Sequence, residues 1–307
     1  MIFELTDATR KRIAAHGEAG QNWLNSLDAH VDELLTSWQL TSVESLAGGS
    51  ESLVLRTKRQ DGSLAILKLG LPGSSNLHQE AKLLAIAGGR GYARLLESDP
   101  HRNAMLIEAL GKPVAQLNLP VHEQIDAILS TLQDAWLPID SSTGLMTGAE
   151  KARWLAPFIT DNWNKLDQPC SEKLIEQALR FIDTREDAHQ HADKVLVHGD
   201  AHEQNTLADP QQSHHYRFID PDGLFAEPAY DVGLQLRSWD EDLLRDDPRK
   251  AGIERCRYLA RNTGLEEQAI WQWGFIERTS TGLHLLELGL TELGETMLGI
   301  AEAWTEA

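Results

Sequence analysis

The spacing of apolar residues changes along the first 110 positions, and the change predicts which parts are helical. Between residues 6 and 36 apolar side chains recur every three or four positions, as on the buried face of a helix. Beyond residue 38 short apolar runs alternate with Gly, Asp, Ser and Pro, which is typical of antiparallel strands. A strand is expected before Gly48, and further strands are expected at 53–57, 64–69, 93–97 and 104–108. One helix, around residues 78–85, interrupts this series.

The remainder of the chain is mostly helical in its periodicity. Helices are predicted at about 119–134, 148–166, 171–186, 250–263, 266–279 and 281–304. A short buried strand is expected at 194–197, followed by a hairpin of 205–208 with 216–219. The pattern predicts an α+β fold in two parts. Residues 1–110 are expected to form N-terminal helices and a small antiparallel sheet with one inserted helix, the nucleotide-binding part. Residues 111–307 are expected to form a mainly helical part that carries the catalytic and substrate residues.

Composition narrows the class of partner. The chain has 307 residues, with 28 Lys and Arg against 47 Asp and Glu, and a formal net charge of −19. Such a field repels nucleic acid and anionic lipid and attracts small cations, although solubility alone also explains it. Two cysteines fit a reducing compartment, and neither a membrane-length apolar run nor a signal peptide is present. We therefore expect a cytoplasmic protein, monomeric or weakly homodimeric, with a small-molecule substrate and no nucleic acid or membrane partner.

One stretch carries most of the candidate chemistry. His-Gly-Asp at 198–200 is followed by Asn205, and Asp220 comes fifteen residues after that asparagine. Asp200 is the candidate catalytic residue because its carboxylate can accept a proton from a substrate hydroxyl. Asn205 and Asp220 offer the hard oxygen ligands that Mg²⁺ prefers, and the Asp-x-x-x-x-Asn interval is that of protein-kinase catalytic loops. Paired carboxylates also occur in glycosidases, but this spacing favours phosphoryl transfer.

A lysine in the first part of the chain supports this interpretation. Lys68 lies inside an apolar strand, where an unpaired ammonium is costly, and Glu80 follows twelve residues later on the predicted helix. Protein kinases use such a lysine–glutamate ion pair to bind the phosphates of the nucleotide. A solvent-facing lysine and a surface glutamate are the ordinary alternative, and the downstream motif favours the ion pair. Gly49 and Ser50 lie in a turn whose backbone could approach phosphates, although the same turn suits any hairpin.

Further candidates concern the adenine and the substrate. The segment 106–110, with Glu108 and Leu110, is the expected hinge whose backbone would bind an adenine edge. Candidate substrate residues are Asp222, Glu227, Trp239, Asp240 and Glu241. The acidic run at 239–242 fits a solvated surface and a site for an ammonium or guanidinium group equally well.

Two residues near the motif are expected to serve the fold. His198 is predicted to brace the backbone of the loop that carries Asp200. Asp231 is predicted to accept hydrogen bonds from backbone N–H groups of the same loop.

Taken together, these residues resemble the aminoglycoside phosphotransferases. The chain is most similar to their streptomycin 6-phosphotransferase and hydroxyurea-resistance kinase branch. The matching runs are 197–205, 219–224 and 227–231, with upstream matches at 67–73, 80–81, 88–96 and 99–108. The resemblance covers about residues 40–240. It implies a two-lobed protein-kinase-like fold with ATP and Mg²⁺ as cofactors.

The resemblance also assigns roles by position. It implies that Asp200 is catalytic, that Asn205 and Asp220 bind Mg²⁺, and that Lys68 grips the phosphates with Glu80 as its partner. Many relatives carry a basic or neutral residue in place of Asp222, so either a metal contact or a substrate amine would suit that acid. The loop at 48–52 has fewer glycines than a protein-kinase loop, and no long activation segment is present.

The expected function is phosphorylation of a hydroxyl on a small, polar, cationic molecule. An aminoglycoside such as streptomycin fits the resemblance, and antibiotic resistance is then the biological role. A sugar, amino-sugar or other metabolite kinase is the first alternative, because the same motifs serve those substrates. A non-catalytic, kinase-like nucleotide-binding protein is the second.

Overall fold

The computed structural model describes residues 5, 7–46, 52–71, 77–140 and 143–305. Gly49 and Ser50 therefore lie outside the described residues. The chain divides into two compact units, residues 1–111 and 112–307. The boundary expected after residue 110 lies one residue from this division.

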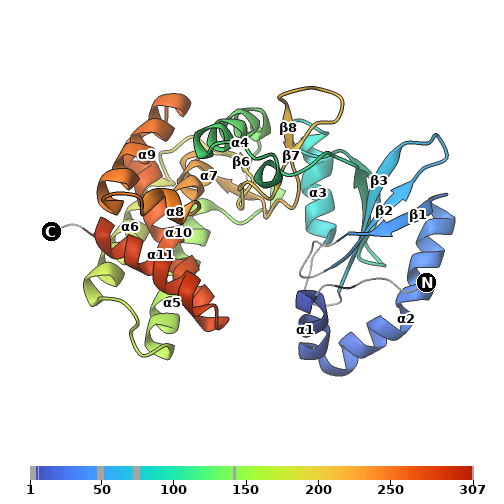
Figure 1. Cartoon of the computed structure of the whole chain (residues 1–307), viewed down its shortest axis with the longest axis horizontal. Helices are drawn as coiled ribbons and strands as arrows, with labels where there is room; N and C mark the ends of the chain where they lie inside the picture. Colours follow the sequence, from blue (N-terminus) through green and yellow to red (C-terminus); the bar gives the residue numbers. More distant parts are fainter. Residues whose placement is uncertain (1–4, 6, 47–51, 72–76, 141–142, 306–307) are drawn as a thin grey trace. The chain divides into compact units, whose positions relative to one another are not determined.

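Unit one is a five-stranded antiparallel sheet with three helices (Figure 1). The strand order in the sheet is β1-β2-β3-β5-β4. Along the chain, the inserted helix α3 lies between β3 and β4. Its elements are α1 (Asp7–Ala15), α2 (Gly17–Ser37), β1 (Thr41–Ser45), β2 (Ser52–Lys58), β3 (Leu64–Gly70), α3 (Leu77–Ala87), β4 (Leu95–Asp99) and β5 (Ala104–Glu108).

Strand register decides which side chains face the core of this unit. Leu55 pairs with Leu67, and Leu67 pairs with Leu106, so these three leucines form one row on one face. They are buried in one cluster with Val31 and Leu34 of α2. The apolar stripe of α2 thus covers this face of the sheet.

The next row of the same strands faces the opposite way. Val54 pairs with Lys68, and Lys68 pairs with Met105. Helix α3, which contacts β3, β4 and β5, lies on this side of the sheet, while α2 lies on the other (Figure 1). The alternation of the strand therefore turns the buried lysine toward α3, where Glu80 lies.

Strand β4 begins two residues later than the predicted 93–97. The Arg94 N–H donates to a carboxylate oxygen of Glu108 at 2.8 Å, while the Glu108 N–H donates to the Arg94 carbonyl at 2.9 Å. A register irregularity between Leu95 and Glu97 follows directly. The apolar pattern did not reveal this side-chain contact, in which a carboxylate takes the place of a backbone acceptor for the Arg94 N–H.

Unit two is mainly helical, with two small antiparallel sheets, β6-β9 and β7-β8. Its elements are η1 (Val114–Gln116), α4 (Val121–Ala135), α5 (Gly148–Lys165), α6 (Glu172–Ala188), β6 (Val195–Val197), β7 (Thr206–Ala208), β8 (Tyr216–Phe218), β9 (Leu224–Ala226), α7 (Ala229–Gly233), η3 (Leu234–Leu236), α8 (Asp240–Leu243), α9 (Pro248–Thr263), α10 (Glu267–Glu287) and α11 (Thr291–Trp304). The predicted hairpin and the three helices before it are confirmed.

Helix α10 is the centre of this unit and corrects one prediction. It contacts α5, α6, α7, α9 and α11 and is buried on nearly all sides (Figure 1). The predicted break at residue 280 is wrong, because the helix continues to Glu287 and turns at Gly289, whose φ is +76°. Gly282 remains helical because Leu298 packs against it, and a Cβ there would lie 2.9 Å from that side chain.

Across the described ranges, no helix combines the length and the apolar character needed to cross a bilayer.

Candidate active site

The loop that carries Asp200 follows β6 and depends on a glycine. Gly199 has a φ of +89°, a conformation that side chains disfavour. A Cβ at this position would lie 2.9 Å from the Cβ of Asp222. The Gly223 N–H donates to the His198 carbonyl at 2.9 Å, which joins this loop to the segment after β8. The His-Gly-Asp sequence thus allows two acidic segments to approach closely.

Asp231 fixes the backbone of the loop that carries Asp200, as predicted. Its side chain is fully buried, and its carboxylate accepts the His198 N–H at 2.8 Å and the Gly199 N–H at 2.9 Å. The Trp136 indole N–H donates to the same carboxylate at 3.1 Å. Burial raises the pKa of Asp231 to about 6, and these three hydrogen bonds oppose the shift. The buried acid therefore orders the loop.

His198 braces the loop from inside, also as predicted. Its Nε2 contacts the Ile219 carbonyl at 2.9 Å, and its Nδ1 accepts the Asp200 N–H at 3.1 Å. These partners require a neutral ring with the proton on Nε2. Burial lowers the pKa of His198 to about 4, so the ring stays neutral at physiological pH.

The Asp200 carboxylate is held at both oxygens. Arg237 donates to Oδ1 at 2.6 Å, and His202 Nε2 lies 3.2 Å from Oδ2. Burial opposes ionisation, but the hydrogen bond from His202 and the charge of Arg237 outweigh it and hold the pKa of Asp200 well below its ordinary value. The side chain keeps 34% of its surface exposed. The geometry presents an ionised, oriented and accessible carboxylate.

Asn205 and Asp220 meet at the ends of β7 and β8. The Ile219 N–H donates to the Asn205 carbonyl at 3.0 Å, so the hairpin places the two positions at adjacent strand ends. Asn205 Nδ2 donates to the Asp200 carbonyl at 3.1 Å, which directs the amide oxygen away from that carbonyl. Asp220 has a φ of +57°, a strained conformation found at functional sites. One amide and one carboxylate oxygen fit a magnesium ion whose other ligands come from phosphates and water.

Arg237 is a site residue that the sequence analysis missed. Its second contact is Glu277 of α10, at 3.9 Å, and Glu277 accepts the Tyr230 hydroxyl at 2.7 Å. Gln235, two residues earlier, donates to the Ala201 carbonyl at 2.8 Å. A signal existed, because Arg237 carries the one charge between Asp231 and Asp240 in the sequence. Helix α10 therefore supports the Asp200 loop through this arginine.

Asp222 lies in the same cluster but is exposed to solvent. Protein around its carboxyl removes part of its hydration, and this effect with the negative charges of Asp200 and Glu277 raises the pKa of Asp222 to about 6. Lys151 of α5 and Arg237 act in the opposite direction. Among the predicted substrate acids, Asp222 is thus the one that the fold places among the charges surrounding Asp200.

Glu227 has a different environment from the one expected of a substrate acid. Its carboxylate lies 3.3 Å from Arg185 Nη1 and accepts the Trp273 indole N–H at 2.8 Å. All three side chains are at least largely buried. These contacts give Glu227 a structural role between α6 and α10.

The acidic run is likewise partly engaged within the protein. Asp240 accepts from Arg278 at 2.8 Å, and the guanidinium of this arginine is fully buried. The Trp239 indole N–H donates to Gln124 at 3.3 Å. Glu241 is exposed. The run therefore neutralises a buried cation, and Glu241 is its member most open to solvent.

In unit one the predicted ion pair is confirmed. Lys68 Nζ donates to both carboxylate oxygens of Glu80, at 2.8 and 3.1 Å, and the two side chains are 8% and 11% exposed. The Glu108 carboxylate is engaged by Arg94, so any hinge contact with a nucleotide falls to the backbone of the segment that ends at Leu110.

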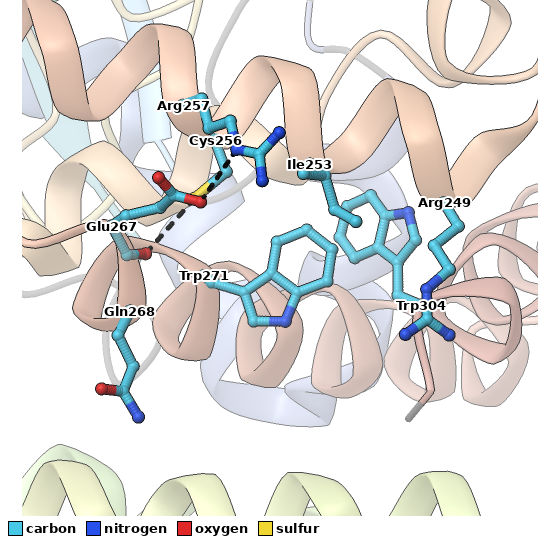
Figure 2. A pocket seen from close by; sticks show the side chains of 8 residues that line it. All are labelled: Arg249, Ile253, Cys256, Arg257, Glu267, Gln268, Trp271 and Trp304. Carbon is cyan, nitrogen blue, oxygen red and sulfur yellow. Dashed lines mark hydrogen bonds and ion pairs between the residues drawn. The ribbon is translucent and has the colours of Figure 1, made fainter. Parts of the chain in front are cut away.

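A separate groove lies on unit two, and none of the predicted site residues lines it. Its volume is about 450 Å³. Figure 2 shows its lining side chains, which come from α9, α10 and α11. Its lining residues are Arg249, Ile253, Cys256, Arg257, Glu267, Gln268, Trp271 and Trp304. Burial raises the pKa of the Cys256 thiol to about 12, so the thiol stays protonated and unreactive at neutral pH. The groove adds nothing to the candidate active site.

The chain is similar in sequence to known proteins. The sequence model of one protein family, the aminoglycoside/hydroxyurea antibiotic resistance kinases, matches residues 37–289 of this chain. A streptomycin 6-kinase of Streptomyces glaucescens is 28% identical over 295 residues, covering 94% of this chain and 92% of that protein. A hydroxyurea phosphotransferase of Kitasatospora aureofaciens is 27% identical and covers 83% of this chain and 76% of its own length.

A solved structure shows the same fold at low identity. The macrolide 2′-phosphotransferase of Brachybacterium faecium has a TM-score of 0.57 and 15% identity, covering 90% of this chain and 98% of that one. This likeness confirms the expected protein-kinase-like fold. By its sequence match over most of its length, the chain belongs to the aminoglycoside/hydroxyurea antibiotic resistance kinases.

Proposed function

We propose that the protein transfers the γ-phosphoryl group of ATP to a hydroxyl of an aminoglycoside, with streptomycin as the first candidate and Mg²⁺ as the metal. The observation that carries this proposal is the state of Asp200. Its carboxylate is ionised, accessible and fixed at both oxygens, as an acceptor of a hydroxyl proton requires.

Each remaining residue has a role in the same reaction. Asp200 orients the acceptor hydroxyl and takes its proton late in the transfer. Asn205 and Asp220 would hold Mg²⁺, which neutralises charge on the phosphates when bound. Lys68, held by Glu80, would bind nucleotide phosphates with its ammonium. Phosphoryl transfer depends on such positioning and charge more than on covalent chemistry.

The choice of substrate rests on relatives and on charge. The streptomycin 6-kinase match extends along nearly the full length of both chains. The net charge of −19 and the exposed Asp222 favour a cationic acceptor. The hydroxyurea phosphotransferase match makes hydroxyurea the second candidate. The intact Lys68–Glu80 pair and the ordered Asp200 loop speak against a non-catalytic binder.

A substrate screen tests the proposal. ATP consumption is measured with Mg²⁺ and streptomycin, other aminoglycosides, hydroxyurea and amino sugars, and each product is examined by mass spectrometry and ³¹P NMR. We expect turnover with streptomycin and a product carrying one phosphate on a hydroxyl. Turnover restricted to a sugar or another metabolite would refute the aminoglycoside assignment while preserving the chemistry. Absence of both turnover and Mg²⁺-dependent ATP binding would refute the enzyme itself.

A further inference from the structure

The groove between α9, α10 and α11 on unit two has a fixed aromatic wall. Its volume of about 450 Å³ is typical of small-molecule sites. The Trp271 and Trp304 rings pack together, with their centroids 4.9 Å apart. The Trp304 indole N–H donates to the Pro248 carbonyl at 2.8 Å, and the Arg278 guanidinium lies 5.0 Å from the centre of a Trp304 ring. Because these contacts hold the wall in place, a ligand would not have to order it.

Hydrogen-bond donors without acceptors line this groove. Within the part of the chain that the structure describes, the indole N–H of the half-buried Trp271 has no acceptor. Arg249 donates from Nη1 to the Thr305 carbonyl at 3.0 Å, and no carboxylate of the described residues forms an ion pair with it. The Arg257 Nε lies 3.4 Å from a Glu267 carboxylate oxygen, which leaves both Nη groups of Arg257 for another acceptor. These donors suit an anionic ligand.

The charge of the lining is opposite to that of the whole chain. Two arginines against one glutamate give the lining a net charge of +1, whereas the chain carries −19. Arg249 and Arg257 are both exposed and lie eight residues apart on one face of α9, about 12 Å along the helix. At physiological ionic strength more distant charges are screened beyond about 8 Å, so the two arginines dominate the local potential. The groove thus complements a negative charge.

The apolar part of the lining indicates what else the ligand must offer. In the view of Figure 2, the Trp271 ring lies on one side of the hollow, and the Ile253 and Arg257 side chains lie on the other. A flat ring can cover an indole face and an aliphatic side chain at once, whereas a simple inorganic anion would leave both uncovered. A neutral ring would leave the arginines without a counter-charge.

We propose that this groove binds a small planar aromatic carboxylate. The ring would pack on the Trp271 indole, and the carboxylate would pair with Arg249 or Arg257. None of the residues assigned to phosphoryl transfer lines the groove, so the proposal does not rest on the proposed function.

Calorimetric titration of the full chain with two matched probes tests the site. 2-Naphthoate is a planar aromatic carboxylate, and 2-naphthamide has nearly the same shape without the charge. We expect 2-naphthoate to bind at one site with a Kd roughly fivefold lower than that of 2-naphthamide, as for one solvent-screened ion pair. ATP with Mg²⁺ should leave the Kd of 2-naphthoate unchanged.

Single substitutions in the lining identify the contacts. Trp271→Ala should raise the Kd of both probes roughly 10-fold, because both lose the indole face. Arg249→Gln or Arg257→Gln should raise the Kd of 2-naphthoate roughly fivefold and leave that of 2-naphthamide unchanged. Glu267→Gln should lower the Kd of 2-naphthoate, because it removes the negative charge from the lining. Trp154→Ala, which removes an exposed indole from α5, is the matched control and should change neither Kd.

Several results would overturn the proposal. These are no binding of 2-naphthoate, equal binding of the two probes, an unchanged Kd in both arginine variants, and displacement of 2-naphthoate by ATP. Arg257 and Glu267 are exposed, so their variants keep the test valid if Trp271→Ala is unstable. Sedimentation tests the other occupant: a wild-type dimer that dissociates in Trp271→Ala would show that a second copy of this chain covers the groove, and would also overturn the proposal.

Discussion

Arg237 holds one oxygen of the Asp200 carboxylate, and replacing it with glutamine tests whether this contact positions the proposed catalytic group. The variant removes a charge-assisted bond of 2.6 Å and leaves Glu277 without its cationic neighbour at 3.9 Å. Glutamine matches arginine only as far as Cδ and carries no charge. The variant therefore removes the charge and the Nη donors that reach Asp200.

The size of the effect follows from the burial of the pair. Arg237 is 17% exposed, whereas Asp200 is 34% exposed, so solvent screens part of the interaction. A hydrogen bond to a charged group contributes about 1.5–3 kcal/mol, and screening reduces this to about 1–2 kcal/mol. If that energy maintains the productive orientation, kcat falls roughly 5- to 30-fold for Arg237→Gln. Arg237→Lys keeps one cationic donor and should recover part of the loss.

The assay is steady-state phosphorylation of streptomycin, with KM and kcat determined separately. Arg255→Gln is the matched control, because Arg255 is also buried in this unit and bonds to Ser238 and Asp242 at 2.7 and 2.8 Å. Both variants should lose thermal stability, but only Arg237→Gln should lose kcat. An unchanged kcat for Arg237→Gln, or an equal loss for Arg255→Gln, would show that Arg237 serves stability alone.

Two further predictions concern the phosphate-binding lysine and the buried histidine. Lys68→Met should lower kcat/KM for ATP roughly 100-fold. The control is Lys58→Met, which changes an exposed lysine of β2. Equal rates of the two variants in stopped assays would contradict phosphate binding by Lys68. His198 has a folded pKa of about 4 against an unfolded value of 6.5, so the unfolded state binds more protons as the pH falls below 6.5. The stability advantage of the wild type over His198→Gln should therefore shrink by about 2 kcal/mol between pH 6.5 and pH 5 in urea titrations. The raised pKa of Asp231 acts in the opposite direction but is common to both proteins, so a pH-independent difference would refute the assignment to His198.

Local patterns in the sequence were sufficient for most of the elements and for the loop itself. The Asp200 motif, taken with a lysine in an apolar strand and a glutamate on the helix after it, predicted the Lys68–Glu80 pair, because a buried ammonium requires an acid beside it. The spacing of Asp200, Asn205 and the hairpin predicted that Asn205 and Asp220 lie at adjacent strand ends. Each of these inferences depended on contacts between nearby parts of the chain.

Contacts between distant helices were not predictable in the same way. Arg237 contacts Glu277, which lies on a helix and comes forty residues later in the sequence. The periodicity of apolar residues does not reveal which acidic side chain faces which basic one. For the same reason the acids at 227 and 240 could not be separated from substrate ligands until Arg185 and Arg278 were placed beside them. The length of α10 was underestimated because periodicity alone did not place the break between α10 and α11, which lies at 288–290.

Asp200→Asn gives the most direct test of the central claim, which is that this carboxylate accepts the proton of the acceptor hydroxyl. The substitution keeps the size of the side chain and removes its negative charge. We predict that kcat for streptomycin phosphorylation falls at least about 1,000-fold, while the Kd of ATP with Mg²⁺, measured by calorimetry, changes less than about threefold. Near-wild-type turnover by this variant would contradict the account.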